Sequence, residues 1–386
     1  MVFMAGPRQS GKTTLARMIA DQFNNHLYFN YDFLENKKKI ITNPTFFEEV
    51  NRIDTTTPLI VLDEIHKYKE WKNYLKGIYD QFNNEYKFLI SGSGRLDIHQ
   101  KGGDSLAGRY LLFYLWPLTL SELADQRLNF NDFFKNPLEI SDQNNELEDI
   151  WENLKEFTGF PEPFVKGNKE FYRIWSNTYH QQLIREDIRN EFQVKQSDNL
   201  ETLFSLLPDR VGSLLSMNNL ANTVNVSFDT IKNWINIFER FFMTFSISPW
   251  SKNISRSILK EKKIYLFNYG IIHNESIKFE NMVAVELMRT ISLWNNLGLG
   301  NFQLHFIRNK EKEEIDFLII HSNKPFLLIE CKLNDENISK TLFKFQNQLN
   351  IPAIQLIDKK SICKIKKNAS NKILIASASR WLPLLP

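Results

Sequence analysis

The chain has 386 residues, of which 42% are hydrophobic and 24% are charged, and its net charge is +3. This length exceeds what one hydrophobic core usually serves, so we expect two or three domains. The two cysteines, Cys331 and Cys363, have no partner at metal-ligand spacing, which argues against a zinc site or a disulfide framework. The longest apolar stretch, residues 110–120, is too short to cross a bilayer, and no targeting segment precedes the first motif. We therefore expect a cytoplasmic protein without a membrane partner.

A short apolar strand at residues 2–5 leads into a glycine-rich loop, which is followed by apolar residues at helical spacing. Glycines let the backbone wrap around phosphate oxygens, and the helix N-terminus adds N–H donors. In such a loop Lys12 reaches the terminal phosphates and the Thr13 hydroxyl ligates magnesium. The sequence thus predicts a site for ATP and Mg²⁺ formed by Gly6, Gln9, Ser10, Gly11, Lys12, Thr13 and Thr14.

Two further apolar segments are typical of buried parallel strands. Residues 58–62 lead into Asp63 and Glu64, and we expect Asp63 to hold the magnesium through water and Glu64 to orient the attacking water. Residues 86–90 lead into Ser91 and Ser93, either of which could sense the terminal phosphate, with Ser93 preferred. Together with a strand at residues 26–29, this alternation of strands and helices predicts an α/β fold with a parallel, doubly wound sheet and nucleotide at the carboxyl ends of its strands.

Several motifs together resemble a family of prokaryotic AAA-type P-loop ATPases with a C-terminal domain of unknown function. They are Gly6-Pro7-Arg8-Gln9-Ser10-Gly11-Lys12-Thr13-Thr14, Leu62-Asp63-Glu64-Ile65-His66, Ser91-Gly92-Ser93, Leu106-Ala107-Gly108-Arg109, Trp116-Pro117-Leu118-Thr119-Leu120-Ser121-Glu122, Gly159-Phe160-Pro161-Glu162 and Phe279-Glu280-Asn281. By this resemblance Arg109 is a candidate arginine finger, acting in cis or from a neighbouring subunit of a homo-oligomer. The alternative for Arg109 is a surface salt bridge.

The middle of the chain offers weaker signals. Residues 125–150 are rich in Asn and Asp and predict a linker or a peripheral insertion, so we place domains at 1–130, 131–255 and 256–386. A helix is expected over residues 175–188. Residues 210–245 have the spacing of a helix-turn-helix, with Ser227 capping its second helix, within a winged-helix-like segment at about 205–245. That second helix offers few basic residues for DNA, which favours a packing module.

The C-terminal segment carries a second pattern of chemical residues. Asp316 heads an apolar strand, and after a turn a second strand ends in Glu330-Cys331-Lys332. Two carboxylates on adjacent strand ends can share Mg²⁺, while Lys332 on the face of Glu330 can orient water. Glu280 on the preceding helix and Gln346 on the following one would complete a site resembling the PD-(D/E)XK nucleases, so we expect an α/β restriction-endonuclease-like domain.

Three functions remain open from the sequence. The first is an ATP-hydrolysing AAA-type switch that repositions a nuclease-like, DNA-interacting C-terminal domain. The second is an ATP-gated, magnesium-dependent DNA nuclease, and the third is a nucleotide-dependent adaptor that binds a protein. Residues 260–386 carry 19 Lys and Arg against 12 Asp and Glu, a net +7, which permits DNA contact.

Overall fold

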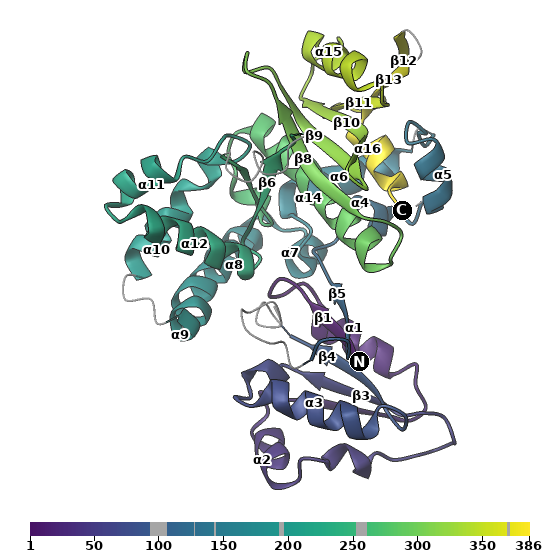
Figure 1. Ribbon diagram of the computed structural model, residues 1–386, viewed down its shortest axis with the longest axis vertical. Coiled ribbons are helices and arrows are strands. Elements are labelled where there is room, and N and C mark those ends of the chain that lie inside the picture. Colours follow the sequence, from purple (N-terminus) through teal and green to yellow (C-terminus); the bar gives the residue numbers. More distant parts are fainter. Residues whose placement is uncertain (93–105, 127, 143, 193–196, 252–260, 369–370) are drawn as a thin grey trace. The chain divides into compact units, whose positions relative to one another are not determined.

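A computed structural model describes residues 1–386 with the exception of 93–105, 127, 143, 193–196, 252–260 and 369–370 (Figure 1). The described residues group into two compact units, one formed by residues 1–116 with 240–242 and the other by 117–239 with 243–386. The sequence predicts domains at 1–130, 131–255 and 256–386, and nearly all of the second and third of these lie in the second unit.

The N-terminal unit is a parallel sheet between helices. Its elements are β1 (Val2–Ala5), α1 (Lys12–Ala20), β2 (His26–Asn30), α2 (Leu34–Thr42), η1 (Phe46–Glu49), β3 (Leu59–Asp63), η2 (Ile65–Lys67), α3 (Trp71–Phe82), β4 (Lys87–Ser91) and β5 (Leu111–Tyr114). The strand order is β2-β3-β4-β1-β5, and every pair is parallel. The predicted parallel α/β sheet is therefore confirmed.

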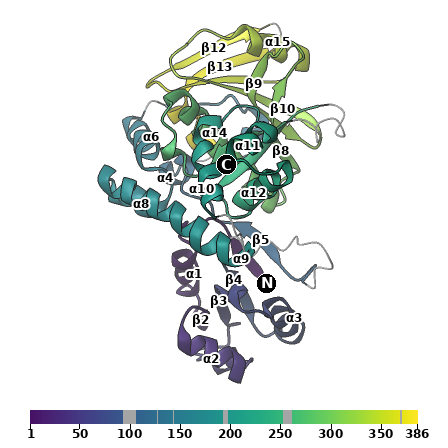
Figure 2. The same ribbon diagram turned by 90° about the vertical axis from the view of Figure 1, so that its left-hand side faces the viewer.

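Both faces of this sheet are covered, which explains its continuous apolar strands. Val61 and Leu89 pack against α1, whereas their neighbours Ile60, Leu62 and Ile90 pack against η1 and α3. Figure 2 shows α1 and α3 on opposite sides of the strands. Because successive strand residues point to opposite faces, one short segment such as β3 supplies both cores.

The second unit contains a helical part followed by a mixed sheet. The helical part comprises α4 (Leu120–Ala124), α5 (Phe130–Lys135), α6 (Asn145–Phe157), α7 (Pro161–Lys166), α8 (Lys169–Gln182), a π-helical turn (Leu183–Ile188), α9 (Arg189–Phe192), α10 (Ser197–Leu206), η5 (Pro208–Arg210), α11 (Met217–Val224) and α12 (Phe228–Arg240). The later elements are β6 (Thr244–Pro249), β7 (Lys263–Leu266), η6 (Tyr269–Ile271), α14 (Glu275–Asn296), β8 (Phe302–Arg308), β9 (Glu314–His321), β10 (Lys324–Lys332), α15 (Lys340–Leu349), β11 (Ala353–Ile357), β12 (Cys363–Asn368), β13 (Asn371–Ser377), α16 (Ala378–Trp381) and η7 (Leu382–Leu384).

The sheet of the second unit has the order β12-β13-β11-β10-β9-β8-β6-β7. Strands β8, β9 and β10 form an antiparallel meander, and β11 returns parallel to β10 after α15. Leu318 and Ile320 of β9 pack with α15, while the alternating Phe317 and Ile319 are fully buried as well. Burial on both faces leaves the strand ends as the place for polar side chains.

The described residues of the segment predicted as a linker or a peripheral insertion include α5 and the first turns of α6, and Phe133 is 1% exposed between Trp294 and Trp381. Asn129 and Asn144 accept hydrogen bonds from the first turns of these helices, so the Asn-rich composition reflects helix caps.

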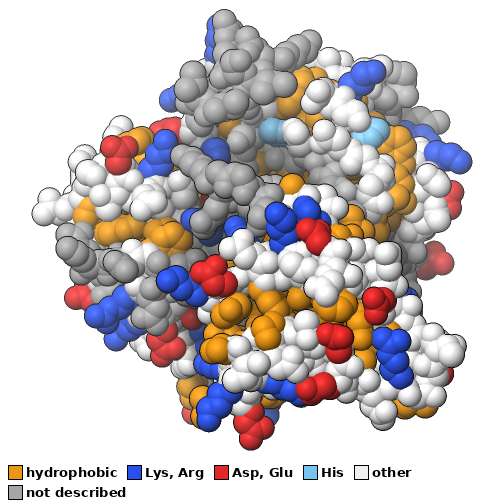
Figure 3. Space-filling view, turned by 60° about the horizontal axis from the view of Figure 1, so that its bottom comes forward, with side chains coloured by type: hydrophobic (Ala, Val, Ile, Leu, Met, Phe, Trp, Pro, Cys, Tyr) orange, Lys and Arg blue, Asp and Glu red, His pale blue; other side chains and the backbone are white. Residues whose placement is uncertain are grey.

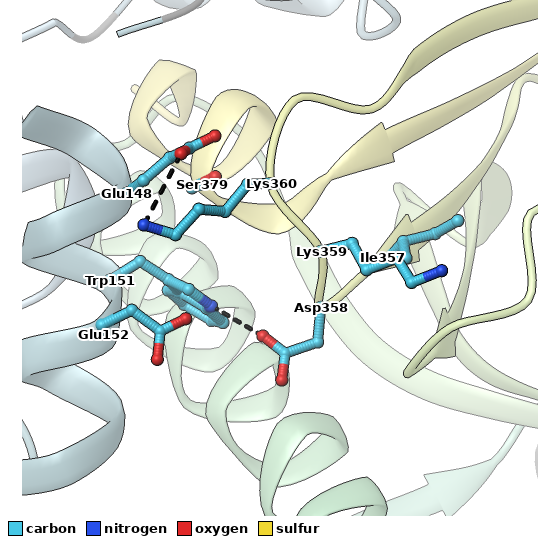
Figure 4. Close-up of a pocket in the computed structure, with 8 residues that line it drawn as sticks. All are labelled: Glu148, Trp151, Glu152, Ile357, Asp358, Lys359, Lys360 and Ser379. Atoms are coloured by element: carbon cyan, nitrogen blue, oxygen red, sulfur yellow. Dashed lines mark hydrogen bonds and ion pairs between the residues drawn. The ribbon is translucent and has the colours of Figure 1, made fainter. Parts of the chain in front are cut away.

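Polar contacts also tie the helical part to the sheet (Figure 4). Trp151 of α6 donates from Nε1 to Asp358 Oδ1 at 3.0 Å, and Lys155 pairs with the same carboxylate. A small cavity of about 90 Å³ lies beside them, next to a contact of 3.8 Å between Lys360 Nζ and Glu148 Oε2. Asp358 and Glu148 each bind side chains of the other part, so these contacts hold α6 against the end of β11.

Candidate functional site

The phosphate loop lies between β1 and α1, at the carboxyl edge of the sheet. Gly6 has φ 147°, and a Cβ at this position would lie 2.2 Å from the Leu115 carbonyl oxygen. Gly11 has φ 92° and directly precedes the first residue of α1. Both glycines are therefore required by the backbone itself, one by close approach and both by a conformation that side chains disfavour.

Lys12 is buried within this loop. Its ammonium donates to the carbonyls of Gly6, at 3.2 Å, and of Pro7. Burial lowers the pKa of Lys12 to about 8, although the carboxylates of Glu64 and Asp63 oppose this shift. The hydrogen-bond acceptors of this buried ammonium are backbone carbonyls, and a lysine so placed in a glycine-rich loop can receive a phosphate.

Asp63 is fully buried at the end of β3. Its Oδ2 accepts hydrogen bonds from Thr13 Oγ1 at 2.8 Å and from the Tyr28 hydroxyl at 2.7 Å, and Asn30 Nδ2 lies at 3.3 Å. The structure thus brings Thr13 and Asp63 together, as a shared magnesium site requires. Tyr28 was not predicted from the sequence, since nothing in a strand pattern says that its hydroxyl points to Asp63.

Three buried oxygen atoms at this edge have no hydrogen-bond partner among the described residues. They are Ser10 Oγ, Asp63 Oδ1 and Ser91 Oγ. Buried polar atoms without partners are costly, and such atoms in a native fold call for a ligand or water. The residues present therefore fit a nucleotide with its metal ion.

Glu64 follows Asp63 with φ 56°, and its backbone N–H donates to the Ser91 carbonyl at 2.8 Å. Its carboxylate lies 3.0 Å from Lys67 Nζ and 3.6 Å from His66 Nε2. Burial raises the pKa of Glu64, while Lys67 acts in the opposite direction. A partly buried carboxylate with a raised pKa beside the phosphate loop has the character of a general base.

Other predicted residues of this unit lie elsewhere. Ser93 falls outside the described residues, so only Ser91 is placed at the tip of β4. Arg109 lies just before β5, and its guanidinium binds Asp80 of α3 at 2.6 and 3.1 Å. Because β5 runs parallel to β1, with Leu111 opposite Val2, Arg109 lies at the sheet edge opposite to the phosphate loop.

The predicted carboxylates of the second unit do lie close together. Asp316 of β9 accepts from the Cys331 backbone N–H at 2.8 Å, and the pair Glu330 and Lys332 on β10 is joined at 2.9 Å. Glu280 of α14 lies near them, because it shares the Lys263 ammonium with Asp316. Burial, followed by the charge of Glu280, raises the pKa of Asp316. Gln346 of α15 donates to the Lys372 carbonyl at 2.9 Å.

A lysine that the sequence reasoning missed lies among these carboxylates. Lys263 Nζ is 2.7 Å from Glu314 Oε1, 3.3 Å from Glu280 Oε1 and 3.9 Å from Asp316 Oδ1. Within the described ranges no three His, Cys, Asp or Glu side chains are arranged to hold a metal ion. Lys263 therefore contacts two residues of the site predicted from the sequence, Glu280 and Asp316.

Comparison with known proteins agrees with the geometry of the N-terminal unit. Residues 1–124 match a family described as an AAA domain. The N-terminal unit is therefore AAA-like. Residues 148–280 and 277–376 match two families described as domains of unknown function.

Relatives are found in Methanocaldococcus jannaschii and Mycobacterium tuberculosis. The uncharacterized protein MJ1637 of Methanocaldococcus jannaschii is 26% identical over 375 residues, covering 89% of this chain and 77% of the relative. The uncharacterized protein Rv2008c of Mycobacterium tuberculosis is 20% identical over 350 residues, covering 89% and 72%. Among solved structures, the Aeropyrum pernix ORC1 protein in complex with DNA is 11% identical, with 73% and 86% covered and a TM-score of 0.33. A likeness this weak has no bearing on function.

In the part of the chain that the structure describes, no helix combines the length and apolar character needed to span a bilayer. Exposed apolar side chains include Phe33, Leu34 and Ile41 on and beside α2. Figure 3 shows hydrophobic side chains gathering on one face among acidic and basic ones, and nothing in the structure indicates what would cover them.

Proposed function

We propose that the N-terminal unit binds ATP with Mg²⁺ and hydrolyses it, and that this turnover acts on the second unit. The observation that supports this most strongly is the group of buried oxygens of Ser10, Asp63 and Ser91 that have no partner among the described residues, together with the buried Lys12 of the phosphate loop. The loop N–H groups and Lys12 would hold the phosphates, while Thr13 and Asp63 would hold the metal ion. The metal ion offsets negative charge on the phosphates.

Glu64 is the proposed base that orients the attacking water. Its carboxylate is held in place by Lys67, and its position next to Asp63 keeps it at the carboxyl edge of β3. Ser91 at the tip of β4 is the described candidate for a residue that senses the terminal phosphate, and Ser93 remains a proposal from sequence.

Arg109 is proposed to act on the nucleotide of a neighbouring copy. A four-residue strand separates it from the phosphate-loop edge of its own sheet, a span of roughly 10 Å, so it does not face its own loop. An arginine finger supplied from a second subunit would make the active form a homo-oligomer.

The first test is phosphate release from ATP by the full chain with Mg²⁺. We expect Lys12→Ala to abolish both nucleotide binding and release, since it removes the charge that meets the phosphates. Glu64→Gln should keep binding but slow release by about 100-fold or more, because it removes only the base. Lys38→Ala, at an exposed lysine of α2, is the matched control. Release that is equal in wild type and Lys12→Ala would contradict the proposal.

The second unit is proposed to be nuclease-like in fold. One helix, α14, is followed by the β8-β9-β10 meander, by α15 and by the parallel strand β11, which places Asp316 and Glu330 on neighbouring strands. This arrangement supports the alternative of an ATP-gated, magnesium-dependent DNA nuclease. Cleavage of double-stranded DNA that requires Mg²⁺ and is lost in Lys332→Ala would establish it.

The third function, a nucleotide-dependent adaptor, is favoured by the position of Lys263 in the carboxylate cluster. The helical part supports the same idea: α10, α11 and α12 followed by the β6-β7 hairpin have a winged-helix-like order, and Ser227 caps α12 through a 3.1 Å bond to the Thr230 N–H. DNA binding that weakens steeply with salt would favour phosphate contacts, whereas salt-insensitive binding to a protein would favour the adaptor.

A further inference from the structure

Lys263 is a buried lysine at the start of β7. Only 1% of its surface is exposed, although most lysines lie in water. Burying an ammonium is unfavourable unless carboxylates compensate it, and here three of them do: Glu280, Glu314 and Asp316. The three carboxylates lie 2.7 to 3.9 Å from the ammonium and so compensate its charge.

The surroundings hold the carboxylates around this ammonium. The Tyr265 hydroxyl donates to Glu280 Oε1 at 2.8 Å, Arg308 binds Glu314 at 2.8 Å, and the Cys331 N–H binds Asp316. These donors come from β7, β8 and β10, while the carboxylates come from α14 and β9. The cluster thus joins five elements through one central cation.

The backbone at Gly212 also packs closely against the Glu280 carboxylate. Gly212 has φ 70°, and a Cβ there would lie 2.9 Å from Glu280 Oε1. The neighbouring Leu214 pairs with Lys263 in an antiparallel bridge. Lys263 is therefore fixed by its own backbone as well as by its charge.

An ammonium and a divalent ion compete for the same place. A divalent metal ion takes carboxylate oxygens at about 2.0 to 2.6 Å, and the Lys263 ammonium already lies 2.7 Å from Glu314 Oε1 and 3.3 Å from Glu280 Oε1. The fourth carboxylate, Glu330, is bound by Lys332 and by the Ser339 hydroxyl at 2.6 Å. Each of the four carboxylates therefore has the ammonium group of Lys263 or Lys332 within 4 Å.

We propose that Lys263 is the resident cation of this cluster, in the place of a divalent metal, and that the native second unit has no metal site there. It follows that these carboxylates do not support metal-dependent cleavage, and that removing the lysine charge would create a divalent-cation site. The proposal goes beyond the ATPase function and does not depend on it.

The test is a titration of the full chain with Mn²⁺ in the absence of nucleotide, in which electron paramagnetic resonance measures the bound ions. Wild type and Asp316→Asn should bind the same number of ions, because the cluster binds none. Lys263→Met should bind one additional ion, and Lys263→Met with Asp316→Asn should lose it. Mn²⁺ should also raise the melting temperature of Lys263→Met by several degrees and leave that of wild type unchanged.

Two results would overturn the proposal. One is Mn²⁺ binding by wild type that Asp316→Asn abolishes, which would mean that a metal displaces the lysine. The other is a folded Lys263→Met that binds no additional ion. If Lys263→Met does not fold, the comparison of wild type with Asp316→Asn still decides the first part. Folding of Lys263→Met combined with Glu280→Gln and Glu314→Gln would then show that unpaired carboxylates caused the failure.

Discussion

Lys12 links nucleotide binding to pH. Its pKa of about 8 means that the free protein holds the ammonium below pH 8 and releases the proton above it. Phosphates stabilise the charged form, so binding above pH 8 must take up a proton. We expect the affinity for an ATP analogue to be constant from pH 7 to 8 and to fall about tenfold per unit above that. Calorimetry in two buffers at pH 9 would check this, since proton uptake should appear there and be absent at pH 7.

Glu286 of α14 is a buried carboxyl group that weakens the fold when it ionises. Burial raises its pKa to about 7, against the opposing effects of the Leu120 N–H and Arg289. A raised carboxyl pKa contributes stability that is present at low pH and is lost as the pH rises through 7. We expect Glu286→Gln to raise the free energy of unfolding by roughly 1–3 kcal/mol at pH 8 and by less at pH 5.5. Urea unfolding at both pH values measures this, and an equal effect at both would contradict it.

Strand β12 is the element best suited to meet DNA. It forms one edge of the large sheet and exposes Lys364 and Lys366. The exposed face of α12 presents Lys232 beside Asp229, so its charges cancel. We expect Lys364→Glu with Lys366→Glu to weaken binding of double-stranded DNA at least tenfold and to reduce the salt slope by about two, whereas Lys232→Glu changes affinity less than about twofold.

Fluorescence anisotropy at several salt concentrations would measure these affinities. Equal losses from the β12 and α12 variants would place DNA elsewhere. No binding by wild type would favour a protein partner.

Elements whose signal is local could be predicted from the sequence. The strands β1 to β4 and the phosphate loop are short continuous patterns, and the hairpin from β9 to β10 carries its acids at the strand ends. The role of Lys263 could not be predicted, because its partners Glu280 and Asp316 lie far along the chain on other elements. The helix α5 was missed for a different reason, since its Asn and Asp residues conceal a buried Phe133.

At the scale of the whole molecule, the position of Arg109 leads us to expect ATP turnover that depends on assembly of several copies of the chain. Lys12→Ala and Arg109→Ala should each be inactive alone, but a one-to-one mixture should recover about a quarter of wild-type turnover, because each variant supplies what the other lacks. Asp80→Asn is the matched control, since it breaks the Arg109 ion pair and keeps the arginine. Loss of turnover in Asp80→Asn as well, without recovery in mixtures, would show that the pair serves only the fold.

The contact between Gly6 and Leu115 lies close to the end of the N-terminal unit. Leu115 donates its N–H to the Ala5 carbonyl at 2.8 Å, and its own carbonyl lies against Gly6, where no side chain would fit. Two residues later, at Pro117, the chain enters the second unit. A side chain larger than hydrogen at Gly6 would therefore have to displace the Leu115 carbonyl, only two residues before the chain enters the second unit.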